Sequence, residues 1–399
     1  MRVAIVTESF LPTINGVTNS VVKVLDHLRE AGHEAIVICP AAGAPTHYRG
    51  FPVYSVPAIA YRQFPVGLPN PQVHRLLAAF RPDIVHAASP FLLGAQALAA
   101  ANRLNIPSIA IFQTDVAGYA KRNRLGPATA WAWRFVRWVH EGADLTLVPS
   151  TASHADLTAA GVPRLAHWGR GVDVEQYHPN LKHGAAATAL RARLSPNGEV
   201  IIGYVGRIAP EKQLERFVAL RDLPGISIAL VGDGPAEGSV RAALAGMPVT
   251  WLGRLGGDEL AAAYASFDVF VHTGTEETFG QTLQEAHAAG LPVVAPRAGG
   301  PIDLISDGSD GYLFDPYDDA SLRTLVEDLC VSAKLRQRMG EAGRRKVRAT
   351  TWHSVCEALM THYLAVIAAR HPVSAAATSR FSVSKAALTS SGRNRTINW

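Results

Sequence analysis

The most informative segment of this chain reads Thr275-Glu276-Glu277-Thr278-Phe279-Gly280-Gln281-Thr282-Leu283-Gln284-Glu285-Ala286. The apolar run Val269–Val271 predicts a strand just before it, and alanines continue a helical pattern from Ala286 as far as Gly290. A strand, a short loop and a helix N-terminus together make a site suited to anions and hydroxyl-rich ligands. The segment therefore predicts a ligand site at the end of a strand.

Two carboxylates in this segment, Glu277 and Glu285, lie eight residues apart. A carboxylate accepts strong, charge-assisted hydrogen bonds from sugar hydroxyls. Glycoside hydrolases also use two carboxylates, but hold them about 5–5.5 or 6.5–9.5 Å apart. If both lie on one helix, the rise of about 1.5 Å per residue separates them by roughly 12 Å, which fits a hydrolase poorly. The remaining alternative is a pair of solvated helix charges.

Size and composition narrow the class of protein. The chain has 399 residues, of which 48% are hydrophobic and 18% charged, as in a soluble globular protein with room for two domains. No run approaches the roughly 18–20 apolar residues of a membrane span, and strand-like residues directly follow Met1-Arg2, so no signal peptide is expected. The three cysteines are widely spaced, which favours buried thiols in a reducing cytoplasm over disulfides or a zinc site.

The chain is basic, with a formal charge of +5 and a pI of about 9.2. Such a balance suits nucleic acid, an anionic membrane or anionic small substrates. No nucleic-acid module is recognisable, so nucleic acid is the weakest of these partners. Residues 119–140 are rich in Lys and Arg, and place Trp131, Phe135 and Trp138 on one helical face. That face either packs in the core or docks on an anionic membrane surface, and the sequence leaves both open.

Strand and helix patterns alternate along almost the whole chain, which predicts α/β layers around parallel sheets. The alternation stops where Pro, Gly, Asn and His cluster, and restarts at Val200. We therefore expect two Rossmann-like domains that face each other across a cleft, a preferred place for ligands. The expected divisions are an N-terminal domain over 1–174, a linker over 175–198, a C-terminal domain over 199–350, a C-terminal helix over 351–370 and a disordered basic tail over 371–399.

Two further loops carry candidate phosphate-binding groups. Near the start of the second domain a strand runs into Gly206 and Arg207, and Lys212 follows at the expected start of a helix. Gly206 lets a ligand approach the backbone, while the Arg207 fork and the compact Lys212 charge can reach one phosphate from two sides. Near the N-terminus, Gly16 lies where a loop enters a helix, so its amide can face a diphosphate. The alternatives are a surface turn with solvated cations and a plain strand–helix connection.

Other cofactor signals are weak. Residues Val231–Glu237 begin like a dinucleotide fingerprint, but Glu237 occupies the third glycine position and Pro235 interrupts the pattern. A nicotinamide enzyme is therefore poorly supported. The sequence has no P-loop and no Asp-x-Asp pair to hold a metal–diphosphate, so we expect neither a metal nor a cofactor.

Taken together, Gly206-Arg207, Glu211-Lys212 and the Glu277/Glu285 pair resemble the retaining family 4 glycosyltransferases of the GT-B fold. Within that family the chain is most similar to the actinobacterial GDP-mannose-dependent α-mannosyltransferases, which act on a glucuronosyl-diacylglycerol glycolipid. The segments that carry this closer resemblance are Ala4–Pro12, Asn15–Val21, Gln113–Gly118 and Gly299–Leu304. The resemblance covers about residues 1–370.

The resemblance implies transfer of α-mannose from GDP-mannose to a membrane glycolipid, in cell-envelope glycolipid or lipomannan synthesis. It implies that the N-terminal domain binds the acceptor and the C-terminal domain the nucleotide sugar. Arg207 and Lys212 would neutralise the departing diphosphate, and Glu277 would hold the transferred sugar. The other donor-binding residues that it implies are Gly16, Gly206, Phe279, Gly280, Gln281 and Glu285, the last at the ribose. The acceptor and sugar region would include Gln113 and Asp115.

One position departs from the family pattern. Many members carry a histidine near the donor sugar where this chain has Gln113, which can form hydrogen bonds but cannot take a proton. A histidine-assisted mechanism is therefore not expected. The alternatives are a UDP-sugar-dependent diacylglycerol glycosyltransferase of the sulfolipid-synthase type and a catalytically idle sugar-nucleotide sensor. The expected location is the cytoplasm, at the inner face of the plasma membrane.

Overall fold

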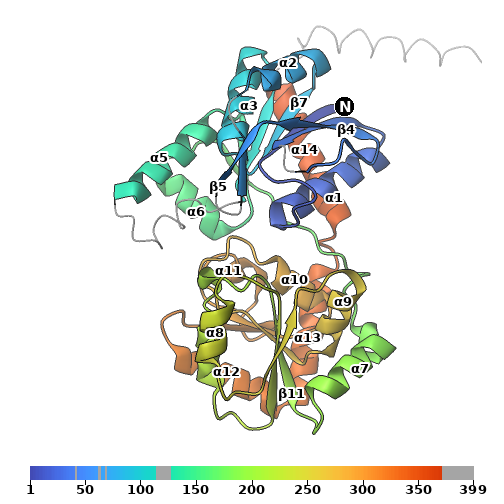
Figure 1. Ribbon diagram of the computed structural model, residues 1–399, viewed down its shortest axis with the longest axis vertical. Coiled ribbons are helices and arrows are strands. Elements are labelled where there is room, and N and C mark those ends of the chain that lie inside the picture. Colours follow the sequence, from blue (N-terminus) through green and yellow to red (C-terminus); the bar gives the residue numbers. More distant parts are fainter. Residues whose placement is uncertain (41–42, 62–63, 68–69, 114–126, 371–399) are drawn as a thin grey trace, which may run out of the picture.

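The chain folds into two lobes, each built on its own parallel sheet (Figure 1). The computed structural model describes residues 1–40, 43–61, 64–67, 70–113 and 127–370. Asp115, the Lys and Arg residues of 119–126 and the tail 371–399 lie outside the described residues. Within the described part of the chain, no helix has the length and apolar character needed to cross a membrane.

The N-terminal lobe contains an eight-stranded sheet in the order β10-β9-β8-β7-β1-β2-β4-β3, parallel except for β3. Apolar runs such as Val3–Val6 are fully buried, because helices cover both faces of the sheet. A hairpin of β5 and β6 lies outside this sheet. The strands are β1 (Arg2–Thr7), β2 (Glu34–Pro40), β3 (His47–Tyr48), β4 (Phe51–Val56), β5 (Ala58–Tyr61), β6 (Phe64–Gly67), β7 (Ile84–Ala88), β8 (Ser108–Ile111), β9 (Leu145–Val148) and β10 (Leu165–His167). The helices are α1 (Gly16–Glu30), α2 (Pro71–Phe80), α3 (Leu92–Arg103), α5 (Pro127–Glu141) and α6 (Thr151–Ala159).

The C-terminal lobe contains a six-stranded parallel sheet in the order β13-β12-β11-β14-β15-β16. This is the doubly wound order, in which ligands bind where the order reverses, here between β11 and β14. The strands are β11 (Val200–Val205), β12 (Ile226–Val231), β13 (Val249–Gly253), β14 (Val269–Val271), β15 (Val293–Pro296) and β16 (Gly311–Phe314). The helices are η1 (Pro179–His183), α7 (Ala185–Leu194), η2 (Pro210–Lys212), η3 (Leu214–Leu220), α8 (Glu237–Ala243), α9 (Gly257–Ser266), α10 (Gln281–Ala288), α11 (Pro301–Leu304), α12 (Asp319–Val331) and α13 (Ala333–Val347).

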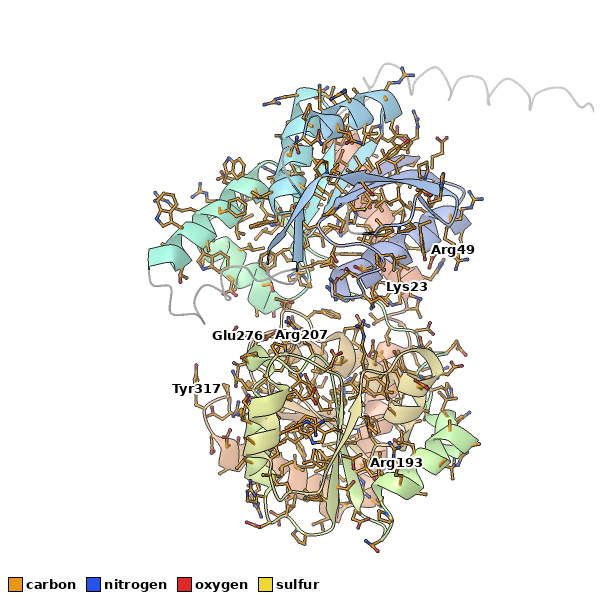
Figure 2. The ribbon with its side chains drawn as sticks, in the orientation of Figure 1. Lys23, Arg49, Arg193, Arg207, Glu276 and Tyr317 are labelled. Atoms are coloured by element: carbon orange, nitrogen blue, oxygen red, sulfur yellow. The ribbon has the colours of Figure 1, made fainter. Side chains whose placement is uncertain are left out.

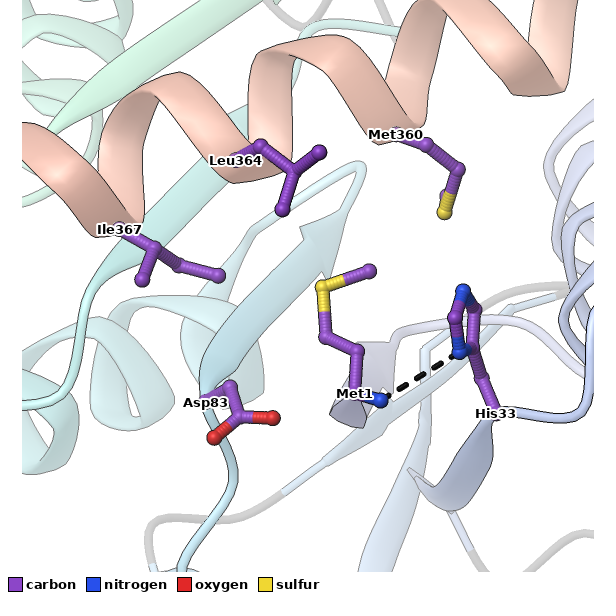
Figure 3. A pocket seen from close by; sticks show the side chains of 6 residues that line it. All are labelled: Met1, His33, Asp83, Met360, Leu364 and Ile367. Atoms are coloured by element: carbon purple, nitrogen blue, oxygen red, sulfur yellow. Dashed lines mark hydrogen bonds between the residues drawn. The ribbon is translucent and has the colours of Figure 1, made fainter. Parts of the chain in front are cut away.

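The last helix, α14 (Trp352–Arg370), returns to the N-terminal lobe and packs beside α1 (Figure 1). The chain thus crosses between the lobes twice, and the two crossings touch through a bridge between Val172 and Thr351. Trp168 Nε1 donates to the Val355 carbonyl at 3.0 Å. A cavity of about 410 Å³ separates α14 from Met1 and His33 (Figure 3). Helix α14, the last element that the structure describes, is therefore part of the N-terminal lobe.

Residues 175–198 are more ordered than their linker composition indicates. They contain η1 and α7, and both pack on α9. Arg191 also donates to the Ser266 carbonyl at 2.9 Å and to Asp268 Oδ2 at 2.9 Å. Composition alone indicated a loop because the contacts that hold this segment come from residues far along the chain.

Candidate active site

The site begins where β11 and β14 end side by side. Lys212 Nζ donates to Glu277 Oε2 at 2.5 Å. The loops that carry these two groups are joined, because the Thr273 hydroxyl donates to the Lys212 carbonyl at 2.7 Å, and Gln213 Nε2 donates to the Thr275 hydroxyl at 2.8 Å. Neighbouring parallel strands bring their carboxyl ends together, so the doubly wound order juxtaposes a cation and a carboxylate that are distant in sequence.

Two glycines shape the loop that carries Glu277. A Cβ on Gly299, whose φ is +63°, would lie 2.4 Å from the Glu277 carbonyl oxygen, and one on Gly300 would lie 2.2 Å from the Phe279 carbonyl oxygen. The Gly300 amide donates to that Glu277 carbonyl at 2.6 Å. Residues 277–279 therefore hold their path only because the facing backbone has no side chains.

Glu277 is ionised throughout the physiological range. Burial alone would raise its pKa, but the Lys212 charge, the neighbouring His272 and a hydrogen bond from the Phe279 amide lower it to about 2. His272 itself is buried, with Nε2 3.9 Å from Glu277 Oε2. Burial and Lys212 lower the pKa of His272 to about 4, so its ring is neutral at pH 7. Sequence reasoning missed this histidine, although it directly follows β14.

Glu285 has a different environment from Glu277. It lies on α10, where the Tyr264 hydroxyl donates to its Oε2 at 2.8 Å. Burial raises the pKa of Glu285 to about 7, against the opposing hydrogen bonds from Tyr264 and Gln281. Because α10 begins at Gln281, Glu277 lies in the preceding loop rather than on the helix. The separation of roughly 12 Å, which assumes one continuous helix, therefore does not apply to this pair.

A cavity of about 470 Å³ lies between the lobes and receives side chains from both. The predicted residues Gly16, Gln281 and Glu285 line it. It also contains three cations that the sequence did not single out, Lys23, Arg170 and Arg254. The mixture of carboxylate, amide and several cations suits a ligand that carries both phosphate and hydroxyl groups.

Arg170 links the predicted residues of the two lobes. Its Nη2 donates to Gln113 Oε1 at 2.9 Å, and its guanidinium carbon lies 6.0 Å from the centre of the Phe279 ring. A Cβ on Gly16 would lie 2.5 Å from Arg170 Nη1, so the guanidinium approaches the start of α1 closely. Burial lowers the pKa of Arg170, and the Glu277 charge opposes that effect. The available sequence signal was the pair of glycines on either side of this arginine, Gly169 and Gly171.

The predicted donor-binding residues around Lys212 have different surroundings in the structure. Arg207 is exposed, on the edge of the C-terminal lobe that faces the N-terminal lobe (Figure 2). Gly206 has a φ of +152°, and a Cβ there would lie 2.6 Å from the Tyr204 hydroxyl. Gly280, with a φ of +107°, precedes α10, and Gln281 donates to the Gly171 carbonyl at 3.0 Å. Lys212 lies in the short η2 rather than at the start of an α-helix.

The surface helix α5 exposes two of its four aromatic side chains, while Trp133 is partly buried against the core. Trp131 is 70% exposed and Trp138 is 61% exposed. Phe135 turns inward and packs against Phe91, with ring centres 5.1 Å apart. Core packing therefore accounts for Phe135 but not for Trp131 and Trp138.

Both lobes match known families. Residues 14–176 match the model of Glycosyltransferase Family 4, and residues 187–346 match Glycosyl transferases group 1. A GDP-mannose-dependent alpha-mannosyltransferase of Mycolicibacterium smegmatis is 46% identical, over 93% of this chain and 99% of its own length. A sulfoquinovosyl transferase of Arabidopsis thaliana is 37% identical, over 88% of this chain and 71% of its own length.

The fold also has solved counterparts. A sucrose-phosphate synthase from Thermosynechococcus elongatus superposes with a TM-score of 0.77 at 20% identity, over 92% of this chain and 99% of its own. At that identity the likeness concerns the fold alone, an α/β architecture of two lobes with parallel sheets.

Proposed function

The chain belongs to glycosyltransferase family 4, and from that membership we propose that it transfers α-mannose from GDP-mannose to a membrane glycolipid, with retention of configuration. The observation that carries the proposal is the Lys212–Glu277 pair at the reversal of strand order, beside a cleft that both lobes line. The choice of GDP-mannose rests on the relative of that name at 46% identity. The UDP-sugar alternative is less favoured, because the sulfoquinovosyl transferase is more distant.

In the proposed reaction, the bond between the sugar C1 and the phosphate oxygen breaks while the acceptor oxygen bonds to C1 on the same face. The acceptor proton passes to the departing phosphate. Lys212 and Arg207 offset the charge that develops on this phosphate, a stabilisation that acts mainly in the transition state. Glu277, which is ionised at physiological pH, accepts hydrogen bonds from the mannose hydroxyls.

The nucleotide would occupy the cavity between the lobes. Glu285 accepts hydrogen bonds from the ribose hydroxyls in its carboxylate form, which is half populated near pH 7. Arg170 and the amides at the start of α1 face the diphosphate from the N-terminal lobe. Gln113, whose Nε2 is buried without a hydrogen-bond partner among the described residues, has a donor left for the transferred sugar.

A membrane-embedded acceptor needs an enzyme that reaches the bilayer surface. The exposed Trp131 and Trp138 of α5 offer the amphipathic rings that favour the bilayer interface. Arg134 and Arg137 lie on the same helix, and anionic lipids attract such cations. We assign α5 as the membrane-facing surface of the N-terminal lobe. Loss of binding to anionic vesicles in the Trp131→Ser, Trp138→Ser double variant is the expected result.

Donor choice tests the proposed reaction directly. Purified protein and a membrane extract of Mycolicibacterium smegmatis are incubated with radiolabelled GDP-mannose or UDP-glucose, with the Lys212→Ala variant as the blank. Label that enters lipid only from GDP-mannose supports the proposal. Transfer only from the UDP-sugar contradicts the donor assignment. Tight nucleotide binding without transfer from either donor, in an extract that serves as acceptor for the 46% identical relative, favours the sensor alternative.

A further inference from the structure

Outside the cleft, three potential metal ligands join α1 to α14. They are His27 from α1 and His353 and Glu357 from α14, and one ligand atom from each lies within 4.8 Å of the other two. His27 Nε2 is 3.1 Å from Glu357 Oε1, and the two histidine rings are 5.4 Å apart at their centres. We propose that this cluster binds a divalent transition-metal ion of the zinc class.

The sequence and the core together place the three ligands. His353 and Glu357 are four residues apart, so they share one face of α14. Buried side chains of α1 and α14, among them Leu28 and Leu359, belong to one hydrophobic cluster and fix the two helices against each other. The ligands therefore lie on backbones that the core already holds.

The distances suit the ion. Zinc binds histidine nitrogen at about 2.0–2.1 Å and carboxylate oxygen at about 2.0–2.2 Å, so tetrahedral ligand atoms lie roughly 3.4 Å from one another. The observed separations, from 3.1 Å up to the 4.8 Å limit, are on either side of that value. Small side-chain movements are enough to bring the three ligand atoms to the spacing that the ion requires. Two imidazoles and one carboxylate are also a ligand set that first-row transition metals favour over magnesium or calcium.

The buried Nε2 of His27 also favours a bound ion. The His27 side chain is only 6% exposed, and its Nε2 has no hydrogen-bond partner among the described residues despite its contact with Glu357. Glu357 is near enough for an ion pair but forms no aligned hydrogen bond with this nitrogen, and a metal ion held by both groups would satisfy the buried nitrogen. His353 and Glu357 are exposed, so an ion can enter from solvent and water can complete its coordination.

The position of the cluster indicates what the ion does. Gly16, Asn19 and Lys23 of α1 line the cavity between the lobes, and His27 lies one turn further along the same helix. Trp352, next to His353, lines the same cavity. An ion would therefore clamp the start of α14, where the chain returns from the C-terminal lobe, onto α1. It would hold the crossing in place and take no part in the transfer step.

The test uses the full chain without an affinity tag, after treatment with a chelator. Calorimetric titration with zinc chloride is expected to show one bound equivalent, and zinc is expected to raise the thermal unfolding temperature. Cobalt(II) bound in place of zinc should give the visible absorption bands that are typical of a low-symmetry metal site. Glu357→Gln and His353→Gln should each lose this equivalent and the thermal shift. Both residues are exposed, so these variants should fold, and circular dichroism checks that they do.

Two variants serve as matched controls. His362→Gln makes the same change further along α14, and His154→Gln disrupts a second histidine pair, stacked with His167 at 4.9 Å between ring centres. Both should keep the bound equivalent. The proposal would be overturned if the wild-type chain bound no stoichiometric zinc ion. It would also be overturned if Glu357→Gln and His353→Gln kept the zinc ion, or if His154→Gln lost it.

Discussion

Replacement of Lys212 by methionine removes the charge but keeps most of the side-chain volume, so it isolates the electrostatic role of this lysine. The Glu277 pKa of about 2, against an ordinary 4.5, corresponds to about 3 kcal/mol of net stabilisation of the charged carboxylate. Lys212 is the principal cation behind it. If the same ammonium acts with similar strength on the departing diphosphate, its loss lowers turnover by roughly 10²–10³.

The measurement is the initial rate at saturating GDP-mannose, together with GDP-mannose affinity by calorimetry. Turnover should fall by this factor, with a smaller change in affinity, because the interaction strengthens as the phosphate leaves. Lys334→Met is the matched control, since Lys334 is exposed on α13 and should leave the rate unchanged. Near-wild-type turnover in a folded Lys212→Met protein would refute the assignment of Lys212 to the leaving group.

The same variant has a stability signature that does not depend on substrate. The pKa of Glu277 is lowered on folding, so its contribution to stability is present above about pH 4.5 and is lost as the pH falls through about 2. Without Lys212, burial raises this pKa again. The free energies of unfolding of wild type and Lys212→Met should therefore differ most near neutral pH and converge towards pH 2. A pH-independent difference would contradict the pairing with Glu277.

Three further predictions concern other parts of the molecule. Because the Glu285 pKa is raised to about 7, its carboxylate form becomes more populated from pH 6 to pH 8, and GDP-mannose affinity measured by calorimetry should rise over that range. Glu285→Gln should weaken GDP-mannose binding and flatten the pH profile. Gly300→Ala should destabilise the protein by about 1–3 kcal/mol in urea unfolding, because the added Cβ overlaps the Phe279 carbonyl oxygen. Gly238→Ala is the control, and it should be neutral or stabilising because the space around Gly238 is open. Trp131→Ser should reduce sedimentation with anionic vesicles, while Tyr317→Ser, at an even more exposed aromatic residue on the other lobe, should not. Equal losses in the two variants would exclude a specific membrane-binding surface.

Much of the secondary structure could be predicted because its signals are local. The expected strand Val269–Val271 has the same bounds in the structure. It is a short apolar run directly preceded by the charged Asp268. Where long-range contacts decide the local structure, composition alone does not predict it. Residues 175–198 fold against α9, although their composition is that of a loop.

The candidate site divides in the same way. The sequence identified Lys212, Glu277 and Glu285, because these residue types follow strand ends in a recognisable spacing. It did not identify Arg170 or His272, which have no motif of their own and matter only through what folding brings near them. The roles of all these residues in transfer stay predictions that the variants above test.

The sequence by itself determined the α/β class, the order of strands and helices and the family, since periodicity, turn residues and motif spacing are written along the chain. Only the tertiary structure decided which charges meet. The reversal of strand order between β11 and β14 pairs Lys212 with Glu277 and lowers the pKa of that carboxyl group, while the burial of Glu285 raises its own. Burial and distance set the energy of a charge, and both are properties of the folded chain rather than of any segment in it.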